Sequence, residues 1–396
     1  MLEGVACGLA RGPEDIKRYV QCTLLNALND FQDVVAKDGA KALAWLRGEN
    51  FLRWDADAHR WDPAPLGRAA AAAHLDPARA VGVIKDILRA RQCLLLESDL
   101  HLLFLCVPPD PPAAVDAAGP EKTERATPSP ATLTAAPTAS ASGRPASDDE
   151  CWLNAKVFLS IYDRLSAHER NVAGAVGITD AYVHRLECGR KDATPEHRAA
   201  RRVCVRFLKA LQLHDVVSER DPNEIMATFG VAGGHLAQLQ EAASRYAGQV
   251  AAVCGPMGWG DVEVLVTRLQ DRISAGARDE ILCLTQIPGI GAARARALYD
   301  AGYRTPESLV GVEPQTLATL LETRSRGRAK MGEMRAATMI VRGAKALCAE
   351  QRRGAREESE AKLRELKKLA PISPDATDEG NDDGSGDDAF DLASAR

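Results

Sequence analysis

The segment of this sequence best suited to binding an anion is a tight turn, Pro288-Gly289-Ile290-Gly291, between two stretches of helical periodicity. Glycines allow backbone conformations and close approaches that other residues cannot adopt. The amides at the start of the following helix would face outward, where the helix dipole favours a phosphate. Arg294 and Arg296 follow within one turn and would add charge-assisted hydrogen bonds. The pattern predicts a helix-hairpin-helix that binds a DNA backbone without reading its bases, although such a hairpin can also serve only to pack neighbouring helices.

The formal net charge of the chain is −5, but acidic and basic residues are unevenly distributed along it. Residues 281–348 contain ten Lys and Arg against five Asp and Glu, whereas residues 374–391 contain eight acids and no base. A basic block of this kind indicates an anionic partner. A second cluster of bases follows the helix-hairpin-helix turn and consists of Arg324, Arg326, Arg328 and Lys330. These side chains could belong to a solvated loop, but we expect them to contact phosphates.

Residues 172–189 resemble a helix-turn-helix, with Gly177 in the turn and Tyr182–Leu186 in the second helix. Arg185, Arg190 and Lys191 would face an anion. Taken alone, the segment is typical of a sequence-specific regulator. Because it lies within a long helical array and not at a chain end, we interpret it as a corner of a larger bundle. The regulator stays open as an alternative.

Motifs for metal or nucleotide chemistry are missing from the sequence. His184, Cys188, His197 and Cys204 are the one cluster of ligand types, and their spacing matches no familiar zinc pattern. The dipeptide Gly-Lys never occurs, so there is no phosphate loop. The acidic triplet 148–150 follows no apolar strand, which excludes the acidic box of a helicase motor. We therefore expect no metal and no cofactor in this chain, and no catalytic residue.

Length and composition predict an intracellular globular protein. A chain of 396 residues suits two or three domains, and 45% hydrophobic with 27% charged residues is typical of folded proteins. No run of 18 apolar residues occurs, so we expect no membrane partner. The ten cysteines form no CxxC pair, which indicates reduced thiols.

The elements that must position these residues are mainly helical. Periodicity predicts one helix from Pro13 to Leu24 and another over about 33–47, and the runs 51–54 and 60–62 predict a short hairpin. Two helices followed by a hairpin are the pattern of a winged helix. Further helices should begin at Pro65 and Pro77, and residues 102–107 fit either a strand or a helix.

The fold class is therefore mainly α, with long helices over 235–253 and 259–273 before the helix-hairpin-helix. Residues 108–150 and the tail after about residue 371 are too poor in large apolar residues to fold. We predict these divisions: 1–65, winged helix; 66–107, start of a helical domain; 108–150, disordered linker or insert; 151–280, helical domain; 281–348, helix-hairpin-helix domain; 349–396, charged helix and disordered acidic tail.

Several phrases along the chain carry a family resemblance: Pro13-Glu-Asp-Ile-Lys-Arg-Tyr19, Pro65-Leu-Gly67, Glu97-Ser-Asp-Leu-His101, Tyr246-Ala-Gly248 and Gly258-Trp259. Together they resemble the C-terminal part of the helicase region of DNA polymerase theta and of the helicase POLQ-like proteins. The archaeal repair helicases of superfamily 2 are more distantly similar. The resemblance covers everything except the linker and the tail. It implies an ATP-dependent helicase that moves 3′ to 5′ on single strands in DNA repair, in the nucleus.

The same resemblance implies roles for residues 235–253, which would be the family's ratchet helix along a single strand. Arg245 would contact a phosphate and Tyr246 would stack on a base. In the family, two RecA-like motor domains that use ATP and Mg²⁺ precede the winged helix, and neither is present in this sequence. We expect this chain to grip single-stranded or forked DNA without an ATP site of its own.

Three explanations for the missing motor stay open: an incomplete gene model, a fragment split from its motor, and a standalone DNA-binding derivative. If a partner chain supplies the motor domains, the complex would be a true enzyme. A repair protein is a further possible partner.

Overall fold

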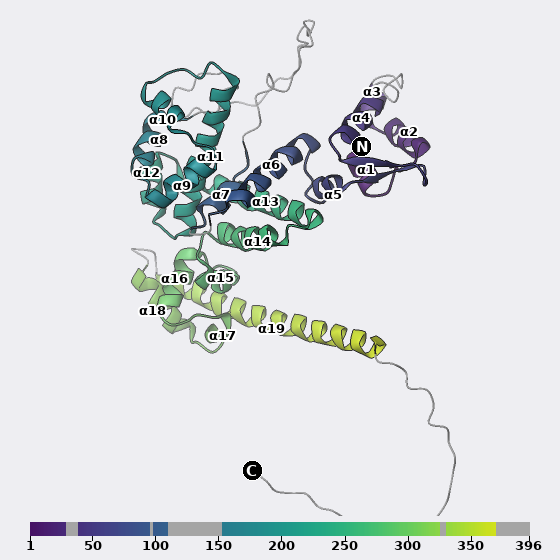
Figure 1. The fold of residues 1–396 in the computed structure, drawn as a ribbon. Coiled ribbons are helices and arrows are strands. Elements are labelled where there is room, and N and C mark those ends of the chain that lie inside the picture. The colour runs from purple at the N-terminus through teal and green to yellow at the C-terminus, as the bar shows by residue number, and fades with distance from the viewer. Residues whose placement is uncertain (29–38, 96–97, 110–152, 325–329, 370–396) are drawn as a thin grey trace, which may run out of the picture.

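Helices make up nearly all of the ordered elements in the computed structural model, which describes residues 1–28, 39–95, 98–109, 153–324 and 330–369 (Figure 1). The predicted fold class, mainly α, is confirmed. The predicted linker, apart from Pro108 and Pro109, lies outside the described residues, and so does the acidic tail beyond residue 369. None of the helices within the described residues has the length and apolar character needed to cross a bilayer.

The N-terminal elements end in the predicted hairpin. They are α1 (Leu2–Ala6), α2 (Pro13–Gln21), α3 (Leu24–Leu28), α4 (Ala40–Gly48), β1 (Leu52–Asp55) and β2 (Arg60–Pro63). The two strands pair antiparallel with Trp54 opposite Trp61, and these rings meet edge to face at 5.2 Å between centroids. The helix predicted over 33–47 falls partly outside the described residues, and its described part is α4. A winged helix remains our interpretation of this arrangement.

The middle of the chain is a bundle around two long helices. Its elements are α5 (Pro65–Ala72), α6 (Pro77–Cys93), α7 (Leu100–Cys106), α8 (Ala155–Tyr162), α9 (Ala167–Ala175), α10 (Asp180–Glu187), α11 (Pro195–Val217), α12 (Pro222–Phe229), α13 (Gly233–Met257) and α14 (Gly260–Ala275). Helix α13 packs along α14 and against α5 and α7. The apolar run 102–107, which fitted either a strand or a helix, forms most of α7, and every residue of α7 is buried.

The remaining helices are α15 (Asp279–Thr285), α16 (Ala292–Asp300), α17 (Pro306–Leu309), α18 (Pro314–Arg324) and α19 (Lys330–Leu369). Two hydrophobic cores divide the described residues: a first core from Leu2 to Ile273 and a second core from Ala277 to Ala344. That residues 151–280 and 281–348 are independent domains stays a prediction. Helix α19 crosses the second core and then extends beyond it (Figure 1). The charged helix expected after residue 348 is thus the second half of α19.

Candidate nucleic-acid interface

The hairpin turn, residues 286–291, joins α15 to α16 and presents its backbone to solvent. Ile287 and Ile290 are buried in the second core and anchor the turn from below. Pro288, Gly289 and Gly291 are exposed. Gly289 has a φ of 88°, a conformation that side chains other than glycine rarely adopt. The sequence-based expectation of a tight, glycine-dependent turn is met at Gly289.

The beginning of α16 is suited to an anion. Gly291 is the N-cap residue, and it offers no side chain to the first amides of the helix. The first turn of α16 contains no acid. Since the first amides of a helix have no intrahelical acceptor, those of residues 292–294 are left to solvent or a ligand. Arg294 donates from Nη1 to the carbonyl oxygen of Gly289 at 2.9 Å, which closes the turn and keeps the guanidinium beside these amides.

Arg296, which was predicted to contact a phosphate, instead pairs with carboxylates of the chain itself. Its guanidinium donates to the Glu219 carboxylate at 2.7 and 2.9 Å and to Glu280 at 2.6 Å. Burial alone would raise the pKa of the Glu219 carboxyl, but the hydrogen bonds from Arg296 and from the amide of Arg278 outweigh it and lower that pKa. Two carboxylates already engage the charge of Arg296, so we assign it the task of joining the helix-hairpin-helix to the end of α11.

This junction predicts a pH dependence. Because the pKa of Glu219 is lowered by folding, its stabilisation is complete above its unfolded pKa of about 4.5 and is lost as the pH falls through the lower folded value. Arg296→Met should cost about 1–3 kcal/mol at neutral pH. Calorimetry at pH 7 and pH 3 should show a gap between wild type and variant that narrows in acid. An equal gap at both pH values would contradict this role.

A second hairpin was missed by the sequence analysis. Helices α17 and α18 flank residues 310–313, and Leu309-Val310-Gly311-Val312 repeats the apolar-glycine pattern of the hairpin turn. An exposed carboxylate, that of Glu313, directly precedes α18 at the place that Gly291 takes before α16. A negative side chain there would repel a phosphate. We therefore assign the second hairpin a packing role.

The basic cluster after the second hairpin lies largely outside the described residues. Arg326 and Arg328 fall in the gap, and Arg324 and Lys330 mark the end of α18 and the start of α19 without a described side chain. Their phosphate contact stays a prediction. Helix α19 does reach the hairpin turn, because a Cβ on Gly343 would lie 3.0 Å from Ile287 Cγ2 and 3.2 Å from Pro288 Cδ.

The two residues predicted on the long helix have opposite environments. Arg245 is 74% exposed at its side chain, and its Nη1 lies 3.8 Å from Oε1 of Glu241 on the same helix. Tyr246 is 7% exposed, and burial raises the pKa of its hydroxyl to about 12. A buried ring cannot present a free face to a base, so the expectation that Tyr246 is an open stacking platform is corrected. Arg245 remains a candidate phosphate contact.

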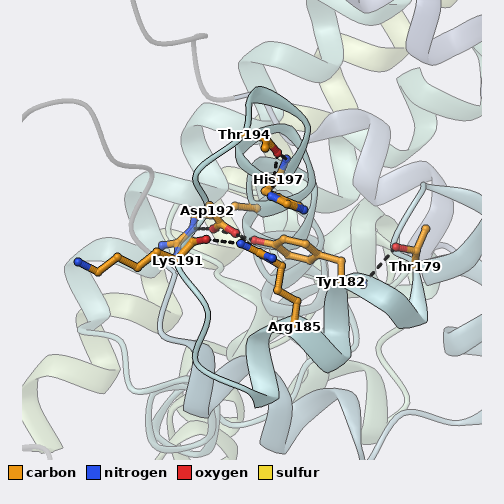
Figure 2. Close-up of polar contacts among 8 residues, drawn as sticks. Thr179, Tyr182, Arg185, Lys191, Asp192, Thr194 and His197 are labelled. Atoms are coloured by element: carbon orange, nitrogen blue, oxygen red, sulfur yellow. Dashed lines mark hydrogen bonds and ion pairs between the residues drawn. The ribbon is translucent and has the colours of Figure 1, made fainter.

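The helix-turn-helix-like segment is held by a polar network (Figure 2). The Tyr182 hydroxyl donates to Asp192 Oδ2 at 3.0 Å, and Arg201 Nε donates to the same oxygen at 2.6 Å. Arg185 donates to the carbonyl oxygen of Lys191, while the Lys191 side chain points away from the cluster. Burial raises the pKa of Tyr182, which keeps the phenol protonated as a donor. The network fixes the loop between α10 and α11.

Helix α10, which would enter the major groove in a regulator, has an unfavourable exposed face. Asp180, His184 and Glu187 are all exposed, and His184 Nδ1 lies 3.1 Å from the Glu187 carboxylate. Acidic groups along this face would repel phosphates. These observations favour the interpretation as a corner of the bundle.

Of the four ligand types noted in the same region, His184 and Cys188 lie close together, with 3.8 Å between Nε2 and Sγ. Cys204 is buried on α11, and burial raises its thiol pKa to about 12. His197 pairs with Thr194 at 2.8 Å between Nδ1 and Oγ1. Across the described ranges, no three His, Cys, Asp or Glu side chains gather as metal ligands.

Three family models match the chain. The DNA_pol_Q helicase like region helical domain matches residues 144–273, the SAM-like Helix-hairpin-helix tandem matches residues 282–325, and a Helix-turn-helix domain matches residues 1–53. The tandem model spans both hairpins described above. The helical-domain model covers the bundle from α8 to α14.

Individual relatives agree with these models. DNA polymerase theta of Drosophila melanogaster is 26% identical over 333 residues, which are 81% of this chain and 14% of that protein. Helicase POLQ-like of Homo sapiens is 23% identical, over 76% of this chain and 23% of that protein. ATP-dependent DNA helicase Hel308 of Pyrococcus horikoshii is 33% identical over 31% of this chain and 17% of that protein.

The resemblance drawn from the sequence is thereby confirmed: the chain is similar to DNA polymerase theta and helicase POLQ-like over most of its length. It spans less than a quarter of the length of each of these three relatives.

Proposed function

We propose that this chain, which is similar to DNA polymerase theta over 81% of its residues, is a DNA-binding portion of a polymerase-theta-like, ATP-dependent 3′ to 5′ DNA helicase that acts in repair. It would grip single-stranded or forked DNA through the phosphate backbone. The observation that carries the proposal is the exposed hairpin turn, where Gly289, Gly291 and the acid-free first turn of α16 leave backbone amides open to an anion.

The chemistry of this grip is electrostatic. Amides at a helix N-terminus and the neighbouring Arg294 hold phosphate oxygens and carry no information about base identity. The surplus of bases over residues 281–348 draws a polyanion to the same part of the chain. Binding would release counterions, so affinity should fall steeply as salt rises.

The energy for strand separation would come from elsewhere. The chain contains no Gly-Lys dipeptide, and the strands in its described residues form one antiparallel hairpin instead of the parallel sheet that presents a phosphate loop. We therefore propose that this chain has no ATP and Mg²⁺ site of its own. Motor domains on a partner chain, or a repair partner protein, would complete the activity, and the nucleus is the proposed location.

The test is a titration of forked, single-stranded and random duplex DNA at two salt concentrations, read by fluorescence anisotropy. We expect forked and single-stranded DNA to bind more tightly than duplex DNA, whatever their sequence, with weaker binding at the higher salt concentration. Strong preference for one duplex sequence would favour the helix-turn-helix regulator instead. Failure to bind any of the three in dilute buffer, or ATP hydrolysis by the purified chain alone, would overturn the proposal.

A further inference from the structure

A stripe of positive charge runs along the exposed side of α19. Successive residues of a helix are rotated by about 100°, so five of the bases over residues 335–356 lie within about a quarter turn of one another. All five are exposed, whereas Ile340 and Ala344 pack into the second core from another face of the same helix. The five, here called the basic stripe, are Arg335, Arg342, Lys345, Arg353 and Arg356.

The charge of the basic stripe is not neutralised by neighbouring carboxylates. Residues 334–356 contain one acid, Glu350, and its position on the helix falls outside the quarter turn of the stripe. Glu360, one turn after Arg356, lies 3.9 Å from Arg364. Within the described residues, no salt bridge reaches any base of the stripe. Because like charges along one face repel each other, the stripe favours a polyanionic partner.

A hollow of about 320 Å³ opens at the start of the basic stripe. It is lined by Met334, Arg335, Thr338, Met339 and Arg342. Met334 and Met339 are 38% and 60% exposed, so two large apolar side chains lie uncovered beside two bases. Methionine adapts its shape to a partner and makes favourable contacts with aromatic rings. The partner that fits this surface therefore carries acids on both sides of an aromatic residue.

The acidic segment of the chain, residues 374–391, contains this arrangement. It ends in Asp-Asp-Ala-Phe-Asp, and Phe390 is its one aromatic residue. We propose that the acidic segment docks on α19, with Phe390 in the hollow against Met334 and Met339 and with its carboxylates along the basic stripe. Eight acids without a base then meet five bases that have no carboxylate of their own.

The chain between α19 and Phe390 is long enough for this contact. Leu369 lies 30 positions after Met339, which corresponds to about 45 Å along a helix. The 21 residues from Leu369 to Phe390 span up to about 70 Å when extended. The acidic segment can therefore run back along α19, with its first acids near Arg356 and its last near Arg335. A tether of this length gives an effective concentration on the order of millimolar, which is sufficient for a weak contact.

The docking would bear on the hairpin turn, because α19 packs beside it. Arg342 of the basic stripe is next to Gly343, where a Cβ would lie 3.2 Å from Pro288 Cδ. A docked acidic segment would bring negative charge close to the surface proposed to hold phosphates, so it would lower the affinity for DNA. This consequence rests on the proposed function, whereas the docking itself does not.

The test is an anisotropy titration of the full chain with a fluorescein-labelled peptide of residues 374–392, in dilute buffer without DNA. In wild type the chain's own segment occupies the surface, so the peptide should bind weakly. Phe390→Ala in the chain weakens this internal contact, and the peptide should then bind roughly tenfold more tightly. Adding Arg335→Glu should remove most of that binding. Adding Arg89→Glu instead, at an exposed base of α6, changes the net charge equally and should leave it intact.

The outcomes separate this inference from the proposed function. No binding of the peptide to the Phe390→Ala chain, or equal effects of Arg335→Glu and Arg89→Glu, would overturn the docking and leave the proposed function untouched, because no DNA is present. If Arg335→Glu weakens binding of forked DNA but not of the peptide, the basic stripe holds DNA and the inference is wrong. If the wild-type chain binds the peptide weakly and binds no DNA at all, the proposed function fails while the docking stands.

Discussion

Replacing Arg206 with methionine is expected to destabilise the first core by about 3–5 kcal/mol, because the change leaves a carboxylate and two carbonyl oxygens without their donor. Arg206 is 6% exposed on α11. Its Nε donates to the carbonyl oxygen of Val107 at 2.8 Å, Nη2 donates to that of Leu105 at 3.4 Å, and Nη1 donates to Asp86. The guanidinium also lies 4.4 Å from the centroid of the Phe104 ring.

The physical reason for so large an effect is that Arg206 joins three segments at once. The carbonyls of Leu105 and Val107 lie at the end of α7, and Asp86 lies on α6, so one side chain ties both elements to α11. Methionine retains the apolar contacts of the inner part of the side chain but donates no hydrogen bond. Urea denaturation followed by circular dichroism measures the loss as a lower midpoint.

A matched control is available on the surface of the same region. Arg220 also pairs with two carboxylates, Asp215 at 2.9 Å and Glu224 at 3.3 Å, but its side chain is 42% exposed. Exposed ion pairs contribute about 0–1 kcal/mol each, so Arg220→Met should change the midpoint little. Equal effects of the two substitutions would show that the buried network around Arg206 is not what stabilises the core.

Local patterns in the sequence predicted local structure well. The hairpin turn was visible because Pro288-Gly289-Ile290-Gly291 lies between two helical periodicities, and β1–β2 because two aromatic-containing runs flank a polar turn. Both features depend on residues fewer than about fifteen positions apart. Helix starts at Pro13, Pro65 and Pro77 were visible for the same reason, since proline at the first helical position is a local signal.

Contacts between distant residues could not be read from the sequence. Arg296 looked like a phosphate ligand because its partner Glu219 lies 77 positions earlier, and no pattern links the two. Tyr246 was expected to stack on a base because the sequence does not reveal its burial. The ring is buried by the packing of α13 against elements far along the chain. The second hairpin did leave a signal, the repeated apolar-glycine pattern at Gly311.

The other large expected effect concerns DNA affinity and the hairpin turn. Gly291→Glu should weaken binding of forked DNA roughly hundredfold, because the new carboxylate would stand where the phosphate binds and like charges in contact cost several kcal/mol. The fold should tolerate the change. Gly291 has a φ of −90° and a ψ of 173°, which any residue adopts, and a Cβ there meets no atom within 4 Å. A carboxylate at a helix N-terminus is also favourable for stability.

Two control variants isolate the charge and the place. Gly291→Ala adds a neutral side chain that accepts no hydrogen bond from the first amides of α16, so it should keep most of the affinity. Gly311→Glu adds the same carboxylate to the second hairpin, where the Cβ also meets open space and where no phosphate contact is proposed. It should bind DNA as wild type does. Thermal midpoints of all three variants should stay near that of the wild-type chain.

The most direct measurement of the central claim is therefore the affinity of Gly291→Glu for forked DNA beside that of Gly311→Glu, at the same salt concentration. The account predicts a loss of about two orders of magnitude for Gly291→Glu and no loss for Gly311→Glu. Equal affinities of the two folded variants would contradict it, because the amides at the start of α16 would then not hold the phosphate backbone.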